Sequence, residues 1–283
     1  MRRLRLLRLM FCTVVCATLT PGAGATEPDL TVVAGGRMAT YAPAALLALP
    51  AATQVTISGD VTYKRDMSFR AIPVAALLAG VGPDETIRFV ANDGFVANLP
   101  AAPLLARGNG TVAYLAIEPP DAPWPPLRAG ESATAGPFYL VWVHPELGGI
   151  HDEQWPYQIA RIESVLPLLK RYPVLAPANG LSAQDPIRHG FAAYEKHCSV
   201  CHTLNLGGDA TIGPDLNVPY NPTEYLRVDA LRRLIRDPQT LRRWPAARMP
   251  KFPATTLSDR ELTDLLAYLR HMADRKVALP PAK

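Results

Sequence analysis

Two cysteines and a histidine lie within five residues of one another, in the stretch CSVCH at positions 198–202. This cluster constrains the fold more than any other feature, because three ligand-type side chains lie close enough together to serve one bound group. The only other cysteines, Cys12 and Cys16, lie within the first 25 residues. One remaining pair does not make a disulfide framework. The cluster therefore indicates a site for a metal or a prosthetic group.

Three kinds of site use such a cluster. Structural zinc usually takes four ligands from two cysteine pairs, and residues 26–283 contain only one pair. A thioredoxin-like redox motif also has two cysteines three residues apart, but its following histidine would be incidental. In the third kind, both thiols add to the vinyl groups of a porphyrin, and His202 becomes the proximal ligand of the iron. We favour this third kind, one covalently bound haem c, because C-x-x-C-H is its signature.

The first 25 residues have the pattern of a secretory signal peptide. Four arginines at positions 2, 3, 5 and 8 precede an apolar run at 9–19. Small residues at 23–25 then form a cleavage site. The apolar run is too short to span a bilayer comfortably. We expect export to the periplasm and no stable membrane span after cleavage. A lipoprotein modified at Cys16 and an uncleaved membrane anchor stay open as alternatives.

The charge of the chain argues against a nucleic-acid partner. The full chain has 29 basic and 25 acidic side chains, but four basic ones leave with the signal peptide, so 25 of each sign remain. The remaining charge is unevenly divided. Residues 26–183 carry 10 basic and 14 acidic side chains, whereas residues 184–283 carry 15 and 11. This asymmetry favours two bodies with different surfaces.

The chain is long enough for two domains, and we expect an α+β architecture. Residues 26–172 predict a strand-rich domain with strands within 53–59, 86–100, 113–118 and 138–145. Asp93-Gly94 provides a tight turn within the second of these stretches. A helix is expected at 74–81, opened by Pro73. Residues 119–136 are rich in proline and glycine and predict a loop, while 163–170 predicts at most a helix broken by Pro167.

Residues 173–185 look like a linker, and residues 186–283 predict an all-α domain. Asp185 suits the N-cap of the first helix, and Pro186 suits its first position. Further helices are expected at 228–237 and 258–276. Ser258 and Glu261 form a capping box at the start of the last one. Leucines 262, 265, 266 and 269 form its buried stripe.

Residues 184–276 resemble a class I cytochrome c with a single haem. The stretches that carry the resemblance are CSVCH, GPDL at 213–216, RMPKFP at 248–253 and LLAYLR at 265–270. In that family the first and last helices cross where a glycine meets an aromatic residue, and Gly190 and Tyr268 are the matching positions. The resemblance implies an electron carrier with a haem between two axial ligands.

The resemblance also implies the second axial ligand. Met249 lies 47 residues after His202 in a proline-bounded loop, and its thioether suits haem iron. Met272, His189, His271 or an open position are the alternatives. These two histidines, together with the one at position 197, are otherwise expected at the surface.

Three further residues enter through the resemblance. The carbonyl of Pro214 accepts a hydrogen bond from the proximal histidine in the family, which fixes the ring. Arg243 and Trp244 precede the methionine loop and are candidates for contact with the haem propionates. The simpler alternative for these two is a surface arginine and a core tryptophan.

Residues 50–165 resemble, less closely, the molybdopterin-binding domain of the sulfite-oxidase-like oxidoreductases. The matching stretches are FRAIPVAALLAGVG, IRFVANDGFVANLP, GPFYLVWV and EQWPYQIARIE. That family binds molybdenum through a cysteine thiolate, but residues 26–197 contain no cysteine. We therefore expect a non-catalytic relative of that fold without molybdopterin. A metal site at His144, His151, Asp152 and Glu153 is a minor alternative to loop polarity.

Together these features predict an exported, single-haem electron carrier with an N-terminal docking or scaffold domain. We expect an electron carrier rather than an enzyme. The alternatives are a subunit or enzyme of a molybdopterin-type dehydrogenase system, and a ligand-sensing or assembly module. Residues 232–251, called here the basic segment, suggest an acidic redox partner, either another protein or the chain's own first domain. The basic residues of this segment are Arg232, Arg233, Arg236, Arg242, Arg243, Arg248 and Lys251.

Overall fold

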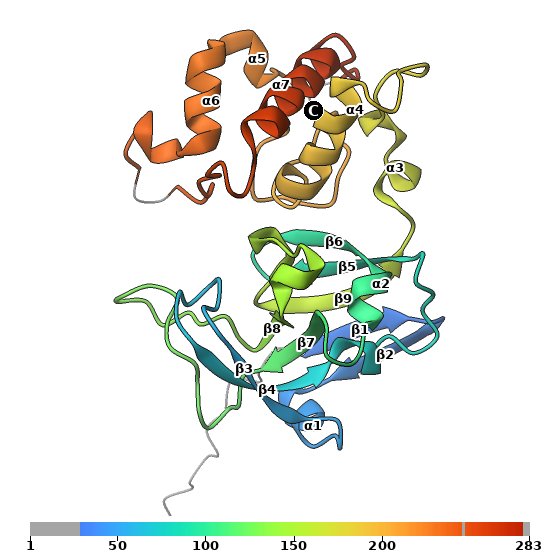
Figure 1. The fold of residues 1–283 in the computed structure, drawn as a ribbon, viewed down its shortest axis with the longest axis vertical. Helices are drawn as coiled ribbons and strands as arrows, with labels where there is room; N and C mark the ends of the chain where they lie inside the picture. Colours follow the sequence, from blue (N-terminus) through green and yellow to red (C-terminus); the bar gives the residue numbers. More distant parts are fainter. Residues whose placement is uncertain (1–28, 245–246, 280–283) are drawn as a thin grey trace, which may run out of the picture.

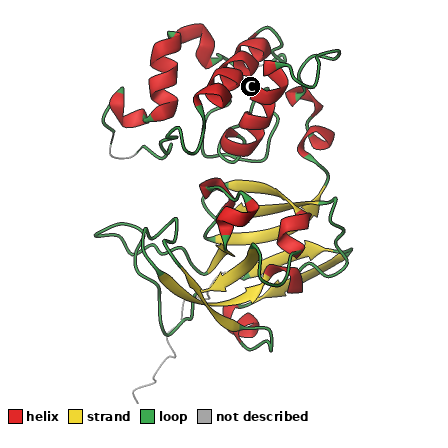
Figure 2. Cartoon of the chain, viewed as in Figure 1, coloured by secondary structure: helices red, strands yellow, loops and turns green. Residues whose placement is uncertain are grey.

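The computed structural model describes residues 29–244 and 247–279. A strand-rich body comes first along the chain and a helical body follows it (Figures 1 and 2). This arrangement confirms the predicted α+β two-domain architecture. The predicted signal peptide, with Cys12 and Cys16, lies outside the described residues. Among the described helices, none is both long and apolar enough to cross a membrane.

The strand-rich domain consists of two sheets that share one core. The five-stranded sheet has the order β2 (Arg37–Tyr41), β1 (Leu30–Ala34), β9 (Ile159–Val165), β5 (Thr86–Ala91) and β6 (Val96–Pro100). The four-stranded sheet has the order β3 (Thr53–Ile57), β4 (Met67–Pro73), β7 (Val112–Ile117) and β8 (Phe138–Val143). Strand β1 pairs in parallel with β9, and the other neighbours pair antiparallel. Two short helices, α1 (Pro43–Leu47) and α2 (Ala101–Leu105), complete the domain.

The predicted strands are present, but the predicted helix at 74–81 is wrong. Strand β4 runs through Pro73, and only a single 3-10 turn follows at Val74–Ala76. Leu78 is buried in the sheet core, and Gly80 adopts a φ of +86°, a left-handed conformation that ends any helical path. At the predicted tight turn, Gly94 supplies the positive φ of +92° between β5 and β6.

The helical domain contains α3 (Leu168–Arg171), α4 (Pro186–Ala193), α5 (Pro222–Tyr225), α6 (Val228–Arg236) and α7 (Asp259–Ala273). The predicted helix starts are confirmed. The Asp185 carboxylate accepts a hydrogen bond from the Ile187 N–H at 2.8 Å, and Ser258 and Glu261 form the capping box of α7. Helix α4 runs on into a π-helical turn at Tyr194–Cys198, which leads directly into the cysteine cluster.

Helices α4 and α7 pack closely because α4 carries a glycine at the contact. A Cβ atom on Gly190 would overlap the Asp264 carbonyl and lie 2.7 Å from the Tyr268 Cβ. This is the glycine–aromatic contact that the cytochrome resemblance implied. The Tyr268 hydroxyl also donates to the Leu175 carbonyl at 2.8 Å, and Leu175 is fully buried. The start of the segment at 173–185 is therefore packed against the helical core.

Candidate haem site

The cysteine cluster forms a tight turn at the end of the π-helical segment. The N–H groups of Cys201 and His202 both donate to the Cys198 carbonyl, at 3.1 and 2.8 Å. Both cysteines are free thiols and partly buried. Burial, with the nearby charge of Glu153, raises the pKa of the Cys198 thiol to about 12, and burial raises the pKa of Cys201 to the same value. A protonated thiol is a poor redox nucleophile, so this environment disfavours the thioredoxin-like alternative.

The ring of His202 is oriented by the loop that follows it. Its Nδ1 lies 2.8 Å from the Pro214 carbonyl oxygen, which can only accept, so Nδ1 carries the proton and Nε2 presents its lone pair. The ring also packs on Gly213, where a Cβ atom would overlap it. Burial lowers the pKa of His202, which keeps the imidazole neutral. A neutral ring with a free Nε2 is the form that binds haem iron.

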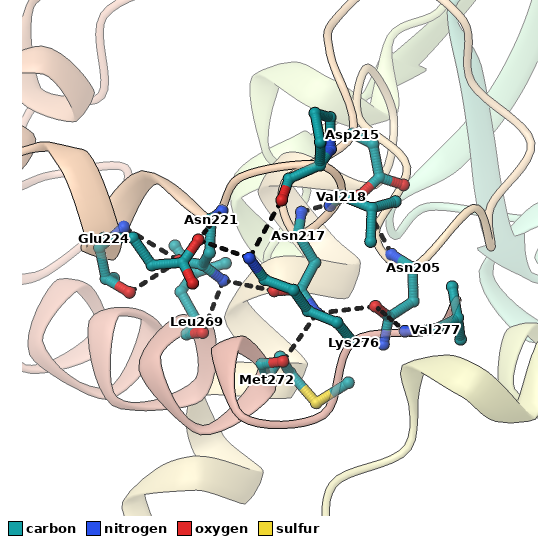
Figure 3. A network of polar contacts seen from close by, with 12 residues as sticks. Asn205, Asp215, Asn217, Val218, Asn221, Glu224, Leu269, Met272, Lys276 and Val277 are labelled. Carbon is teal, nitrogen blue, oxygen red and sulfur yellow. Dashed lines mark hydrogen bonds and ion pairs between the residues drawn. The ribbon is translucent and has the colours of Figure 1, made fainter. Parts of the chain in front are cut away.

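The loop that carries Pro214 is folded around one carboxylate. The Asp215 Oδ1 accepts hydrogen bonds from the backbone N–H groups of Asn205, Asn217 and Val218, at 3.1, 2.8 and 2.8 Å. Its Oδ2 accepts from the Leu206 N–H at 2.7 Å. The start and the end of the loop are thereby tied to the residue next to Pro214 (Figure 3).

Three buried asparagines connect this loop to the C-terminal end of α7, and we call them the asparagine ladder: Asn205, Asn217 and Asn221. The Asn217 side-chain amide donates to the Met272 carbonyl and to the Asn205 side-chain oxygen, both at 2.7 Å. The Asn221 amide donates to the Leu269 carbonyl at 2.9 Å and to the Asn217 side-chain oxygen at 2.8 Å. The ladder thus adds hydrogen bonds to two carbonyls in the last turns of α7, one of which, Met272, also accepts from the Arg275 N–H at 2.9 Å, and it fixes the proximal loop (Figure 3).

The predicted methionine ligand lies in a loop anchored to α6. Met249 is partly buried and packs against the core of the helical domain. Shortly after it, the Phe252 N–H donates to the carbonyls of Ile235 and Arg236, at 3.3 and 3.1 Å. By contrast, the alternative ligand Met272 is only 1% exposed in the hydrophobic core.

The alternative histidine ligands are engaged elsewhere. His189 lies 3.6 Å from the Asp264 carboxylate, and the His271 Nε2 accepts a hydrogen bond from the Ala178 N–H at 3.1 Å.

The two candidates for contact with the haem propionates, Arg243 and Trp244, lie at the surface. Arg243 is exposed, and Trp244 is 59% exposed with the Arg242 guanidinium 5.9 Å from its ring centroid. Trp244 is therefore a surface residue and not the core residue of the simpler expectation.

His197 was expected at the surface, and this prediction is wrong. The side chain is only 2% exposed, because it lies between Glu153 and His151 of the strand-rich domain and Phe252 of the helical domain. Its Nδ1 lies 3.0 Å from the Glu153 carboxylate. Sequence alone gave no signal for this burial, since it depends on contact between two domains.

The suggested metal cluster at 144–153 is dispersed in the structure. His144 lies beside Glu146 at 3.5 Å, and Asp152 beside Lys64 at 3.7 Å. Across the described part of the chain, no group of three or more histidine, cysteine or acidic side chains is arranged to hold a metal ion. Loop polarity and pairing explain these residues.

Residues 187–273 match the family model for cytochrome c. The match lies within the helical domain, covers less than half of the chain and does not extend to the strand-rich domain, whose resemblance to the sulfite-oxidase-like enzymes stays a prediction. A search of curated proteins finds no match to the chain. The family match and the geometry around His202 agree, and the helical domain is a cytochrome c domain, the fold of a haem-containing electron carrier.

Proposed function

We propose that this chain is an exported c-type cytochrome that carries one covalently bound haem and transfers single electrons. The observation that carries the proposal is the orientation of His202, directly after the cysteine pair, with Nδ1 bonded to Pro214 and Nε2 free. Cys198 and Cys201 would hold the haem through thioether bonds, and Met249 would bind the iron opposite His202. The bound haem supplies the one-electron redox chemistry.

Covalent attachment is tested on protein from a host that exports and matures c-type cytochromes. Denatured wild-type protein should retain its haem, and its mass should exceed that of the processed polypeptide by one haem. A Cys198→Ala/Cys201→Ala variant should release any haem into acidified organic solvent. Extraction of the haem from the wild-type protein would contradict the proposal, and a mass gain of two haems would contradict the single-haem assignment.

We propose that the external partner is an acidic redox protein, which docks on the exposed part of the basic segment. Two of its arginines serve the fold. The Arg236 guanidinium donates to the Phe252 carbonyl at 2.8 Å and to the Asp259 carboxylate at 2.6 Å, and Arg232 donates to Thr263 at 3.0 Å. The residues left with exposed side chains include Arg242, Arg243, Arg248 and Lys251.

The chain's own first domain is a poor candidate for this acidic partner. One ion pair that joins the two domains has the opposite polarity: Arg88 of the strand-rich domain approaches Asp209 of the helical domain. The docking proposal is tested by measuring electron transfer to an acidic protein against salt concentration. Arg242→Glu should slow the reaction and flatten its salt dependence, because screening acts on opposite charges. Arg37→Glu on β2, an equal charge change at an exposed site, is the control.

We also propose that the strand-rich domain is a non-catalytic scaffold. The support is the absence of cysteine from residues 26–197 and the satisfied state of Asp60, which is the most buried acid among the described residues of this domain. The Asp60 carboxylate accepts hydrogen bonds from the N–H groups of Thr62 and Tyr63, at 2.9 and 2.8 Å, and from the Tyr139 hydroxyl at 3.1 Å. These bonds give Asp60 a structural role.

A further inference from the structure

The edge of the five-stranded sheet meets the helical domain at the cysteine cluster. Strand β6 is the outer strand of its sheet and faces the helical domain (Figure 1). Its Val96 N–H donates to the carbonyl of Val200, the residue directly before Cys201, at 3.0 Å. The Gly94 carbonyl accepts from the Thr211 N–H at 3.3 Å. The hairpin of β5 and β6 is therefore hydrogen-bonded to the segment that would carry the haem.

A buried carboxylate next to this contact fixes the two domains together. Asp209 lies between His202 and Gly213 in sequence, and its side chain is only 4% exposed. Its Oδ1 accepts from Arg88 and Arg171, both at 2.5 Å. The remaining contacts with its carboxylate are those of the Tyr172 hydroxyl at 3.0 Å and the Asn98 amide at 3.2 Å. We call these residues the Asp209 junction.

The junction is rigid because its partners are themselves held. Arg88 also donates to the Glu163 carboxylate at 2.6 Å, and Arg161 pairs with the same carboxylate at 2.9 Å. Arg171 donates to the Asn98 side-chain oxygen at 2.9 Å. A network in which each buried charge is paired specifies one geometry, whereas a single surface pair would not.

On the other side of the cluster, the buried His197 contacts the strand-rich domain through Glu153 at 3.0 Å. The neighbours of the partly buried Cys198 are buried, with exposed fractions of 2% for His197, 3% for Ser199 and 6% for Val200. Contacts thus flank both ends of the C-x-x-C stretch.

We propose that the strand-rich domain is a fixed cover over the cysteine edge of the haem site, and that this cover raises the reduction potential of the haem by excluding water. The inference rests on the proposed function, because it concerns a haem attached at Cys198 and Cys201. Removing an electron from the iron leaves one more positive charge, and a drier, less polarisable surrounding disfavours that charged ferric state.

The main test opens the junction without changing the net charge. The double variant Arg88→Gln/Asp209→Asn removes one positive and one negative group from the interface. At a fixed potential, we expect the ferrous-to-ferric ratio to fall by about tenfold, a shift of about 59 mV for a one-electron couple. Spectroelectrochemical titration of the full-length haem protein measures it. Arg128→Gln/Glu131→Gln removes an exposed pair 3.6 Å apart from the same domain and should leave the potential unchanged.

A steric variant tests the same cover without touching a charged group. A Cβ atom at Gly94 would overlap the Thr211 side chain, so Gly94→Val should push the hairpin away from the cluster. Gly108 has a similar φ of +100° with open space around it, so Gly108→Val is the control for backbone strain alone. We expect a lower potential for the first variant only. Amide hydrogen exchange should also accelerate at Val96 in both opened variants.

The outcomes separate the cover from the haem proposal. A lower potential in both opened variants, with unchanged controls, supports the cover. Unchanged potentials in variants whose Val96 amide exchanges faster would overturn it while leaving the haem assignment intact. A wild-type protein without covalent haem would remove the proposed function, and this inference with it.

Discussion

The asparagine ladder makes a specific prediction about the stability of the helical domain. Asn217 is fully buried, and its side chain makes three hydrogen bonds, to the Met272 carbonyl, Asn205 and Asn221. Leucine has the same branched shape with four side-chain heavy atoms but makes none of these hydrogen bonds. At about 1 kcal/mol for each net bond, Asn217→Leu should lower the free energy of unfolding by about 3 kcal/mol. The Met272 carbonyl keeps its hydrogen bond from the Arg275 N–H at 2.9 Å, so the expected loss comes from the three bonds of Asn217 alone.

The assay must report on the helical domain alone, because a two-domain chain does not unfold in one step. Guanidinium unfolding followed through the haem absorbance meets this need and yields the free energy by linear extrapolation. Exchange of the His202 ring proton should also become faster, since the ladder holds the loop of Pro214. The exposed Asn179 provides the matched control, Asn179→Leu. A loss below about 0.5 kcal/mol for Asn217→Leu would refute the reasoning.

Four further predictions follow from residues described above. Met249→Ala should abolish the sulfur-to-iron charge-transfer absorption of the ferric protein and lower the potential, whereas Met272→Leu should preserve the absorption; the reverse pattern would move the ligand to Met272. Gly190→Leu should prevent close packing of α4 on α7 and cost at least several kcal/mol of stability, which chemical unfolding would measure against wild type. Elemental analysis of protein from its native host should find no molybdenum, and a stoichiometric amount would restore the enzyme alternative. Finally, although burial alone would raise the pKa of Asp209, hydrogen bonds from Arg171 and its other partners hold it below the usual range. The contribution of Asp209 to domain docking is therefore complete above about pH 4 and is lost as the pH falls through its lowered pKa. Amide exchange at Val96, measured at decreasing pH, would detect this loss.

Motifs with local chemistry were predictable from the sequence. The N-cap at Asp185 and the capping box at Ser258 each depend on a few neighbouring residues, and the structure confirms both because short-range geometry leaves few alternatives. The contact of the Pro214 carbonyl with His202 was implied by the family resemblance, and the structure contains it. The helix expected at 74–81 failed where sheet packing and a left-handed Gly80 decided the conformation.

Contacts between domains were not predictable from net charge. The first domain carries an excess of acidic residues, yet it contributes the cation Arg88 to a carboxylate of the basic helical domain. Net charge averages over a whole surface, whereas docking depends on a few buried groups. The asparagine ladder was missed for a related reason, since amides that cap a helix end have no periodic pattern in the sequence.

The covered position of the cysteine cluster has a consequence for how the molecule is assembled. An attachment enzyme has to reach both thiols, and the docked hairpin of β5 and β6 hydrogen-bonds to the residue between them. The strand-rich domain is also the first to emerge during synthesis, so its hairpin is ready before the cysteines follow. Given the proposed haem attachment, we therefore expect ligation while the two domains are still apart, with closure of the Asp209 junction as the final step of maturation.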